Sequence, residues 1–232
     1  MIVCYNPEVA NRVNFVPGEW YHCFSRGVDG RVVFESDSDY RRFIETLYLA
    51  NSADPVHRSN ANKRDSVYAR ERGNTIVSIG AYALMPNHFH LLIRELDESG
   101  ISRFMQKVGI SYGMYFNIKN ERIGNLFVRP FRSRHVSNDI YFQHCVDYIH
   151  LNPLDLFEPA WKSRGISDIH KAMSNLLKYP HSSYPDFYGE KRDEKAILGS
   201  EIDEAYFIKS PLELLGNAVE YRLGEEVIKM TS

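Results

Sequence analysis

Residues 83–93 read Ala-Leu-Met-Pro-Asn-His-Phe-His-Leu-Leu-Ile, and this stretch decides the fold class. It joins two apolar runs, 76–84 and 88–96, at a Met-Pro-Asn turn, which predicts an antiparallel pair of strands. Successive side chains of a strand point to opposite faces, so His88 and His90 project together while the apolar residues between and after them face a core. Two imidazoles on one face are half of a metal chelate.

The segments on either side of this hairpin predict further strands and helices. Residues 20–25 alternate aromatic and polar side chains, which predicts a first strand, and 32–34 predict the strand that returns beside it. Ser36 followed by Asp39 three positions later has the form of a capping box, so we expect a helix to begin there. Apolar residues at helical spacing predict three helices, over 36–51, 101–124 and 139–151. Antiparallel strands with helices gathered on one face make an α+β sandwich.

Length and composition limit the class of protein. At 232 residues the chain can bury a full core with room for an appended segment, and its polar stretch 52–74 predicts a long loop. The three cysteines are isolated and odd in number, which argues against a disulfide framework or a cysteine metal site and fits a reducing cytoplasm. No apolar run approaches the roughly 20 residues of a membrane span, and the first residues lack a signal-peptide pattern. We therefore expect a cytoplasmic protein without a membrane partner.

The formal net charge of −2 conceals an uneven distribution of charged residues. Residues 101–136 hold seven basic side chains and the single acid Glu121, whereas the segment after Asp186 is rich in acids. A basic centre favours a nucleic-acid partner, although most charge runs are simply solvated faces.

A tyrosine and an asparagine one helical turn apart complete the candidate site. The i, i+4 spacing places Tyr148 and Asn152 on one face of the predicted helix 139–151, within reach of a common ligand. Pro153 disfavours helical angles at Asn152, which should therefore lie at or just past the last turn. Each feature has an ordinary structural explanation, such as a core tyrosine or a helix terminator, but their coincidence favours a site where a phenol and an amide face paired imidazoles.

Several stretches together resemble one family, the REP-associated tyrosine transposases, which are one-tyrosine transposases of the His-hydrophobe-His endonuclease superfamily. The similarity spans about residues 18–189. The stretches that carry it are 83–93, 124–127 with Arg132-Ser133, Val146-Asp147-Tyr148-Ile149-His150-Leu151-Asn152-Pro153, and a weaker Pro180-His181-Ser182-Ser183-Tyr184. The first and third are specific in combination.

The resemblance implies a ferredoxin-like catalytic fold whose central antiparallel sheet presents the histidine pair. It implies that His88 and His90 are metal ligands, that Asn152 is the third ligand, and that Tyr148 is the nucleophile. The implied cofactor is Mg²⁺ or Mn²⁺, although imidazole ligands also suit zinc. The implied activity is cleavage and strand transfer of single-stranded, hairpin-forming DNA through a covalent 5′-phosphotyrosine. The catalytic domain would comprise residues 1–160, followed by an extension over 161–232 that is acidic towards its end.

The basic centre is the predicted DNA surface. We expect six side chains to contact phosphates of a folded single strand, which makes affinity fall with salt. They are Lys107, Lys119, Arg122, Arg129, Arg132 and Arg134. The sequence leaves open whether the chain acts as a monomer or a homodimer.

Two other functions remain open at this point. The first is a metal-dependent hydrolase in which His88 and His90 act with another histidine, either His135 or His150, to activate water. The second is a non-catalytic module that stacks single-stranded bases on aromatic side chains. Cleavage that survives Tyr148→Phe would favour the hydrolase, and tight binding without cleavage under any divalent ion would favour the module.

Overall fold

Four strands form one antiparallel sheet in the order β2-β3-β1-β4 in the computed structural model, which describes residues 14–54 and 66–216. Helix α1 (Asp37–Ala50) follows the first strand and α2 (Gly100–Lys119) follows the third. This β-α-β-β-α-β order is the ferredoxin-like arrangement, so the α+β class and the antiparallel sheet are confirmed. The strands are β1 (Trp20–Arg26), β2 (Val77–Met85), β3 (His88–Glu95) and β4 (Arg132–Val136).

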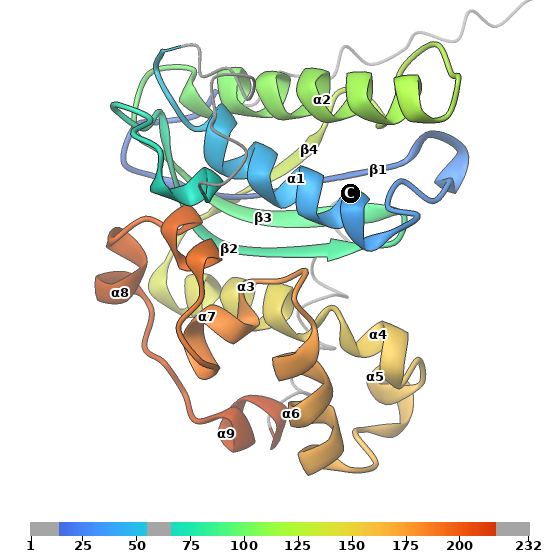
Figure 1. Ribbon diagram of the computed structural model, residues 1–232. Helices are drawn as coiled ribbons and strands as arrows, with labels where there is room; N and C mark the ends of the chain where they lie inside the picture. Colours follow the sequence, from blue (N-terminus) through green and yellow to red (C-terminus); the bar gives the residue numbers. More distant parts are fainter. Residues whose placement is uncertain (1–13, 55–65, 217–232) are drawn as a thin grey trace, which may run out of the picture.

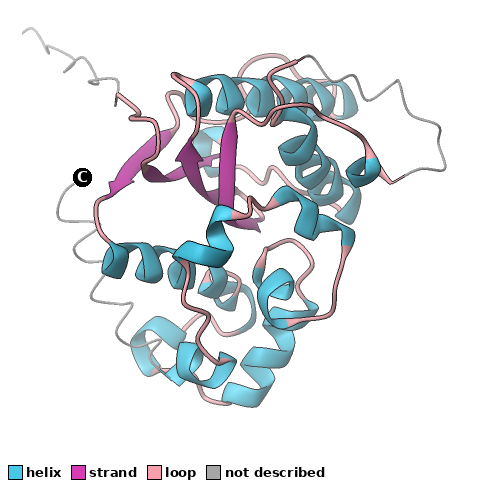
Figure 2. Ribbon diagram, turned by 90° about the vertical axis from the view of Figure 1, so that its left-hand side faces the viewer, coloured by secondary structure: helices cyan, strands magenta, loops and turns pink. Residues whose placement is uncertain are grey.

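Helices cover both faces of the sheet (Figure 1). The face that carries Phe89 and Leu91 packs on α1 and α2, and the opposite face packs on α3 (Asp139–Leu151) through Leu92 and its neighbours. The prediction of helices on one face therefore holds for α1 and α2 but not for α3. The reason lies in β2, where all nine residues are buried, because a strand that is apolar on both sides needs a cover on each. Figure 2 shows the strands between these two layers from a second direction.

Local signals placed strands β1, β2 and β3 and helices α1, α2 and α3, whereas β4 and the helices after α3 were not predicted. Helix α1 begins with the predicted capping box, in which Asp39 accepts hydrogen bonds from the backbone N–H groups of Glu35 and Ser36 at 2.9 and 3.1 Å. The prediction of a return strand over 32–34 was wrong. The N–H groups of Val33 and Phe34 both donate to the carbonyl oxygen of Pro86, at 2.8 and 3.1 Å, so this segment braces the β2–β3 turn instead of joining the sheet.

The predicted loop 52–74 lies partly outside the described residues. Its described part contains one 3₁₀ turn, η3 (Val67–Ala69), after which the chain enters β2. None of the helices within the described ranges is long and apolar enough to cross a membrane.

The C-terminal part of the chain packs beneath α3 and along the edge of β2. Backbone hydrogen bonds from Leu84 to His181 and from Ser183 to Tyr82, at 2.9 and 2.8 Å, cover the outer edge of β2. The domain boundary at residue 160 stays a prediction. The helices of this part are α4 (Leu154–Phe157), α5 (Trp161–Arg164), α6 (Ile169–Lys178), α7 (Tyr184–Tyr188), η4 (Asp193–Ile197), α8 (Glu201–Ala205) and α9 (Pro211–Gly216).

A buried carboxylate of α3 helps to fasten this part of the chain to the helix. Asp147 is fully buried, accepts a hydrogen bond from the Tyr206 hydroxyl at 2.5 Å and forms an ion pair with Lys209 at 2.6 Å. The carboxylate that precedes Tyr148 in sequence is thus neutralised by residues about 60 positions later.

Arg192 holds the covered edge of β2 in place. Its guanidinium pairs with the buried carboxylate of Asp186 through two nitrogens, at 2.7 and 2.6 Å, and also donates to the carbonyl oxygens of Pro180 and Ser182 and to the Tyr82 hydroxyl. A planar five-donor fork is suited to such a junction of several acceptors.

We expect Arg192→Ala to lower the free energy of unfolding by about 3–5 kcal/mol, because it leaves the buried Asp186 carboxylate without its partner. Chemical denaturation followed by circular dichroism measures the change. Arg103→Ala is the matched control, because its pair with Asp97 is exposed and should contribute less than about 1 kcal/mol. Equal losses in the two variants would contradict the proposed role of Arg192.

Candidate functional site

The paired histidines lie on the face of β3 that α3 covers. His88 and His90 are two residues apart on the strand, and their ring centroids are 5.1 Å apart with the ring planes at 90°. Phe89 between them packs into the core on the opposite face. The strand alternation expected from the sequence is therefore what brings the two imidazoles together.

Helix α3 brings Tyr148 to the histidines. The helix begins at Asn138, whose side chain accepts a hydrogen bond from the backbone N–H of Tyr141 at 2.8 Å. The neighbouring Val146 and Ile149 are fully buried against the sheet, and the half-buried Tyr148 ring lies 5.5 Å from that of His90. Packing of α3 thus places a phenol edge-on beside one imidazole.

A third histidine, which the sequence analysis missed, lies under the pair. His22 on β1 is buried, and its Nε2 is 2.9 Å from Nδ1 of His90. Its ring is also 5.8 Å from that of Tyr148. The strand was predicted, but the register that pairs β1 with β3 is a long-range property that no local pattern specifies.

Each proposed ligand ring has one nitrogen already engaged. Nδ1 of His88 is 2.7 Å from the side-chain oxygen of Asn87, and Nδ1 of His90 faces His22. Because an amide oxygen can only accept, His88 carries its proton on Nδ1 and keeps a lone pair on Nε2. That nitrogen is the one available to a metal ion.

Burial keeps both rings neutral, the form that binds metals. It lowers the pKa of His88 to about 4, with a further contribution from the positive charge of Arg26. Burial, followed by the neighbouring His22 and His88, holds the pKa of His90 well below its ordinary value.

Asn152 lies at the C-terminal end of α3, as the sequence predicts. It keeps helical angles, φ −51° and ψ −42°, although Pro153 follows it, because α4 begins directly afterwards and continues the turn. Its side chain is buried, and Nδ2 donates to the carbonyl oxygen of Tyr148 at 2.9 Å. The amide thus bonds to its own helix and not to either imidazole, which leaves its oxygen as the potential metal ligand.

Two imidazole nitrogens and one amide oxygen form a donor set that a divalent ion accepts. Among the described residues, no three side chains of histidine, cysteine, aspartate or glutamate are grouped so as to hold a metal. The assignment of Asn152 as the third ligand beside His88 and His90 stays a prediction, because the side-chain hydrogen bond described for Asn152 is the one to the Tyr148 carbonyl oxygen.

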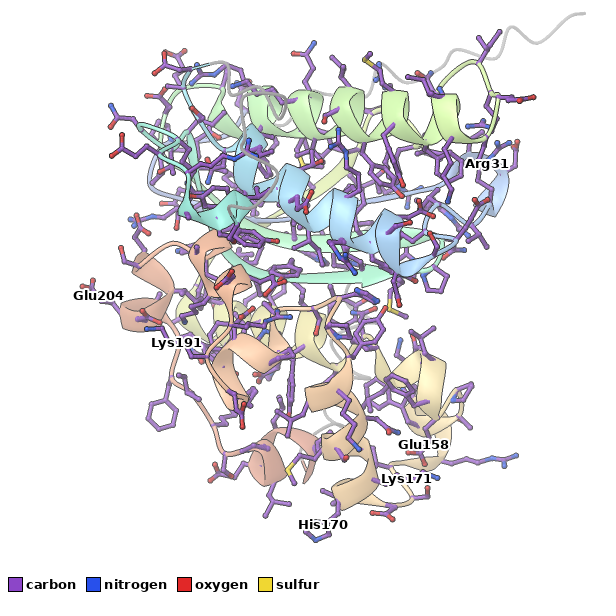
Figure 3. The ribbon with its side chains drawn as sticks, viewed as in Figure 1. Arg31, Glu158, His170, Lys171, Lys191 and Glu204 are labelled. Carbon is purple, nitrogen blue, oxygen red and sulfur yellow. The ribbon has the colours of Figure 1, made fainter. Side chains whose placement is uncertain are left out.

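The other histidines proposed for a hydrolase lie elsewhere. His135 pairs with Glu19 at 2.9 Å and lies beside Tyr21, on the sheet face opposite to His90. His150 bonds to the Ser183 hydroxyl at 3.0 Å within an aromatic cluster, and burial lowers its pKa to about 3. Figure 3 shows the labelled His170 pointing outward at the far end of α6. Neither His135 nor His150 therefore supplies the third imidazole of a hydrolase site beside His88 and His90.

The six predicted DNA contacts divide between the two faces. On β4, Arg132 pairs with Phe24 and Arg134 with His22, and because cross-strand partners share a face, both arginines lie on the histidine side. The members of the set on or just after α2 lie on the other side, where several have internal partners. Lys107 donates to the Ser52 carbonyl oxygen, Lys119 pairs with the buried Asp39 at 2.7 Å, and Arg122 donates to the Asn117 side chain. Arg129 is exposed in the loop before β4.

Two positive charges near the histidines were not predicted. Arg26 on β1 pairs with His88 across the sheet. The positive charge of Lys162 on α5 helps to lower the pKa of both His88 and His90. Lys162 is itself paired with Asp155 at 3.0 Å. The site is therefore bordered by cations from β1, β4 and α5, an arrangement that suits a polyanionic substrate.

Comparisons with known proteins give a similarity in structure but none in sequence. No family model matches the chain, and no curated protein matches it. A solved structure described as "Structure of the REP associates tyrosine transposase bound to a REP hairpin" is similar with a TM-score of 0.49 at 14% sequence identity. The alignment covers 86% of this chain and 94% of that chain.

Proposed function

We propose that this chain is a metal-dependent DNA nicking and strand-transfer enzyme of the tyrosine transposase type. The observation that carries the proposal is the convergence of His88, His90 and Tyr148. The ring of His90 on β3 lies 5.1 Å from that of His88 and 5.5 Å from that of Tyr148, which comes from a helix far along the chain. Arginines on the same sheet face support a nucleic-acid substrate. A folded, hairpin-forming single strand is the class of DNA that the sequence motifs imply.

In the proposed reaction, the Tyr148 oxygen attacks the scissile phosphorus and loses its proton. The bond from phosphorus to the 3′ oxygen breaks, and that oxygen takes up a proton and leaves as a free hydroxyl. The product is a 5′-phosphotyrosine, which a second DNA hydroxyl can attack to join new ends with no external energy. The phenol has an ordinary pKa of about 10, so attack depends on its deprotonation at the site.

A divalent ion bound here would polarise the phosphodiester and stabilise negative charge on its oxygens. His88 and His90 would hold it through Nε2 and Asn152 through its amide oxygen. Asn152 also bonds to the Tyr148 carbonyl, so the third proposed ligand and the nucleophile are joined within one helical turn.

The test is to incubate the full chain with a labelled single-stranded hairpin and Mg²⁺ or Mn²⁺. The proposal expects a protein–DNA adduct that survives denaturation, together with a released strand ending in a 3′-hydroxyl. Tight binding without cleavage under either ion would support the non-catalytic module instead.

Arg132→Ala should weaken binding of this hairpin and lower the slope of log affinity against log salt by about 0.7, the value for one phosphate contact on a single strand. The reason is its exposed position beside the histidines. Fluorescence anisotropy at several salt concentrations measures the slope.

Arg122→Ala is the matched control, because Arg122 lies just after α2 and is held by Asn117 at 2.7 Å. Its salt slope should equal that of the unmodified protein. An equal reduction in both variants would mean that DNA also covers the α2 side and that the histidine face alone is not the binding surface.

A further inference from the structure

The buried imidazole of His22 has a defined relation to the proposed ligand His90. His22 pairs with Leu92 across β1 and β3, so it is the diagonal neighbour of His90 on the same face. The two rings lie 5.1 Å apart at an interplanar angle of 26°, and one nitrogen of each is within hydrogen-bonding distance. His22 is only 2% exposed, so it is enclosed beneath the site and cannot be a surface contact for substrate.

Only one of the two proton arrangements in this pair allows His90 to bind a metal ion through Nε2. If Nε2 of His22 donated, Nδ1 of the neutral His90 would accept, and Nε2 of His90 would carry the proton. If Nδ1 of His90 donates, its Nε2 keeps a free lone pair. His88 already has this second arrangement, because its Nδ1 faces the amide oxygen of Asn87.

The surroundings of His22 hold its ring in one orientation. Phe24 lies 5.0 Å from it along the strand, and Tyr148 meets it at 5.8 Å with the planes at 72°. A ring packed from two sides presents its acceptor nitrogen in one direction, towards His90. Partners of this kind are what orient histidines in metal sites.

We propose that His22 is a positioning residue: its Nε2 accepts a hydrogen bond from Nδ1–H of His90 and thereby leaves Nε2 of His90 as the ligand atom. The inference rests on the proposed function, because it assigns a role towards the metal that His88 and His90 would hold. It adds a third histidine, on a different strand, to the residues that determine metal affinity.

The experiment measures Mn²⁺ affinity of the full chain by isothermal titration calorimetry, with hairpin cleavage as a second readout. His22→Phe keeps a ring of similar shape but removes the acceptor, and should weaken Mn²⁺ binding by about 10–100-fold, the usual effect of losing a partner of a metal ligand. His22→Gln supplies an amide acceptor and should recover most of the affinity. Phe142→Leu is the control for packing, because Phe142 of α3 is buried on the same sheet face and packs on Trp20, and the Mn²⁺ affinity of this variant should stay near that of the unmodified protein.

A direct readout does not depend on the stability of any variant. Two-bond ¹H–¹⁵N spectra of the metal-free chain report which nitrogen of His90 carries the proton, and Nδ1–H is expected. Protonation at Nε2 would overturn the inference, as would unchanged Mn²⁺ affinity in His22→Phe or an equal loss in Phe142→Leu. If the unmodified chain neither binds Mn²⁺ nor cleaves the hairpin, the proposed function itself fails. If it does both, and replacement of His22 changes neither, only the positioning role of His22 is contradicted.

Discussion

Replacement of Tyr148 by phenylalanine is expected to abolish the covalent protein–DNA adduct and to lower strand cleavage by at least about 10⁴-fold, the scale of loss when an enzyme loses its nucleophile. Phenylalanine keeps the ring that packs beside His90 and His22, so the fold and the affinity for DNA should be retained. A denaturing gel of the labelled hairpin after incubation with Mn²⁺ measures the adduct, and anisotropy measures binding.

The control variants for this experiment are Tyr112→Phe and Tyr115→Phe. Both tyrosines lie on α2, across the sheet from the histidines, where their hydroxyls donate to the Val33 carbonyl oxygen and to Asp39. Adduct formation should survive in both variants. An adduct that persisted in Tyr148→Phe, or that mapped to either control residue, would contradict the assignment of the nucleophile. Cleavage without any adduct in Tyr148→Phe would point to hydrolysis by an activated water.

His88→Ala should remove metal-dependent cleavage, with a loss of about 10³-fold or more, because a metal ion contributes several kcal/mol to stabilising charge on a phosphoryl transition state. His88 is a better choice than His90 for this test, because it is half-buried and makes its side-chain hydrogen bond to the adjacent Asn87. The core face of β3, including Phe89, is untouched by the substitution. Cleavage rate and Mn²⁺ affinity are measured together, with thermal unfolding as a check of the fold.

His135→Ala is the matched control, since His135 is exposed on the opposite face of the sheet. It should leave both the cleavage rate and the Mn²⁺ affinity unchanged. Full metal-dependent cleavage in His88→Ala would show that the ion, if one is used, is held elsewhere. Loss of cleavage in His135→Ala would instead support the alternative function, a metal-dependent hydrolase that uses a different set of histidines.

Features encoded in short stretches of sequence could be predicted well. Helix α3 has the predicted bounds because Asn138 caps its first turn and Pro153 lies two residues after its last residue, Leu151. The β2–β3 hairpin was placed within one residue at every end because a turn separates two apolar runs. The alternation within β3 then placed His88 and His90 on one face.

Features that depend on contacts between distant segments could not be predicted. His22 became part of the site only through the register between β1 and β3, and Lys162 only through the packing of the short helix α5. The packing of α1 and α2 on the sheet face opposite to α3 was not predicted for the same reason, because the amphipathic pattern of a helix does not say which side of a sheet it will occupy. The basic residues show the opposite error. They are close in sequence, but the arginine side chains of β4 and the helix α2 lie on opposite faces of the sheet.

Because Asp147 pairs with Lys209 and accepts a hydrogen bond from Tyr206, we expect the helix of the proposed nucleophile and the C-terminal segment to unfold together. A local opening that frees residues 206–209 would leave a buried, uncompensated carboxylate at the position before Tyr148, so α3 would loosen with it. How often the nucleophile is correctly placed thus depends on a segment that never touches the chemistry. Amide hydrogen exchange in α3 would follow changes made about 60 residues away.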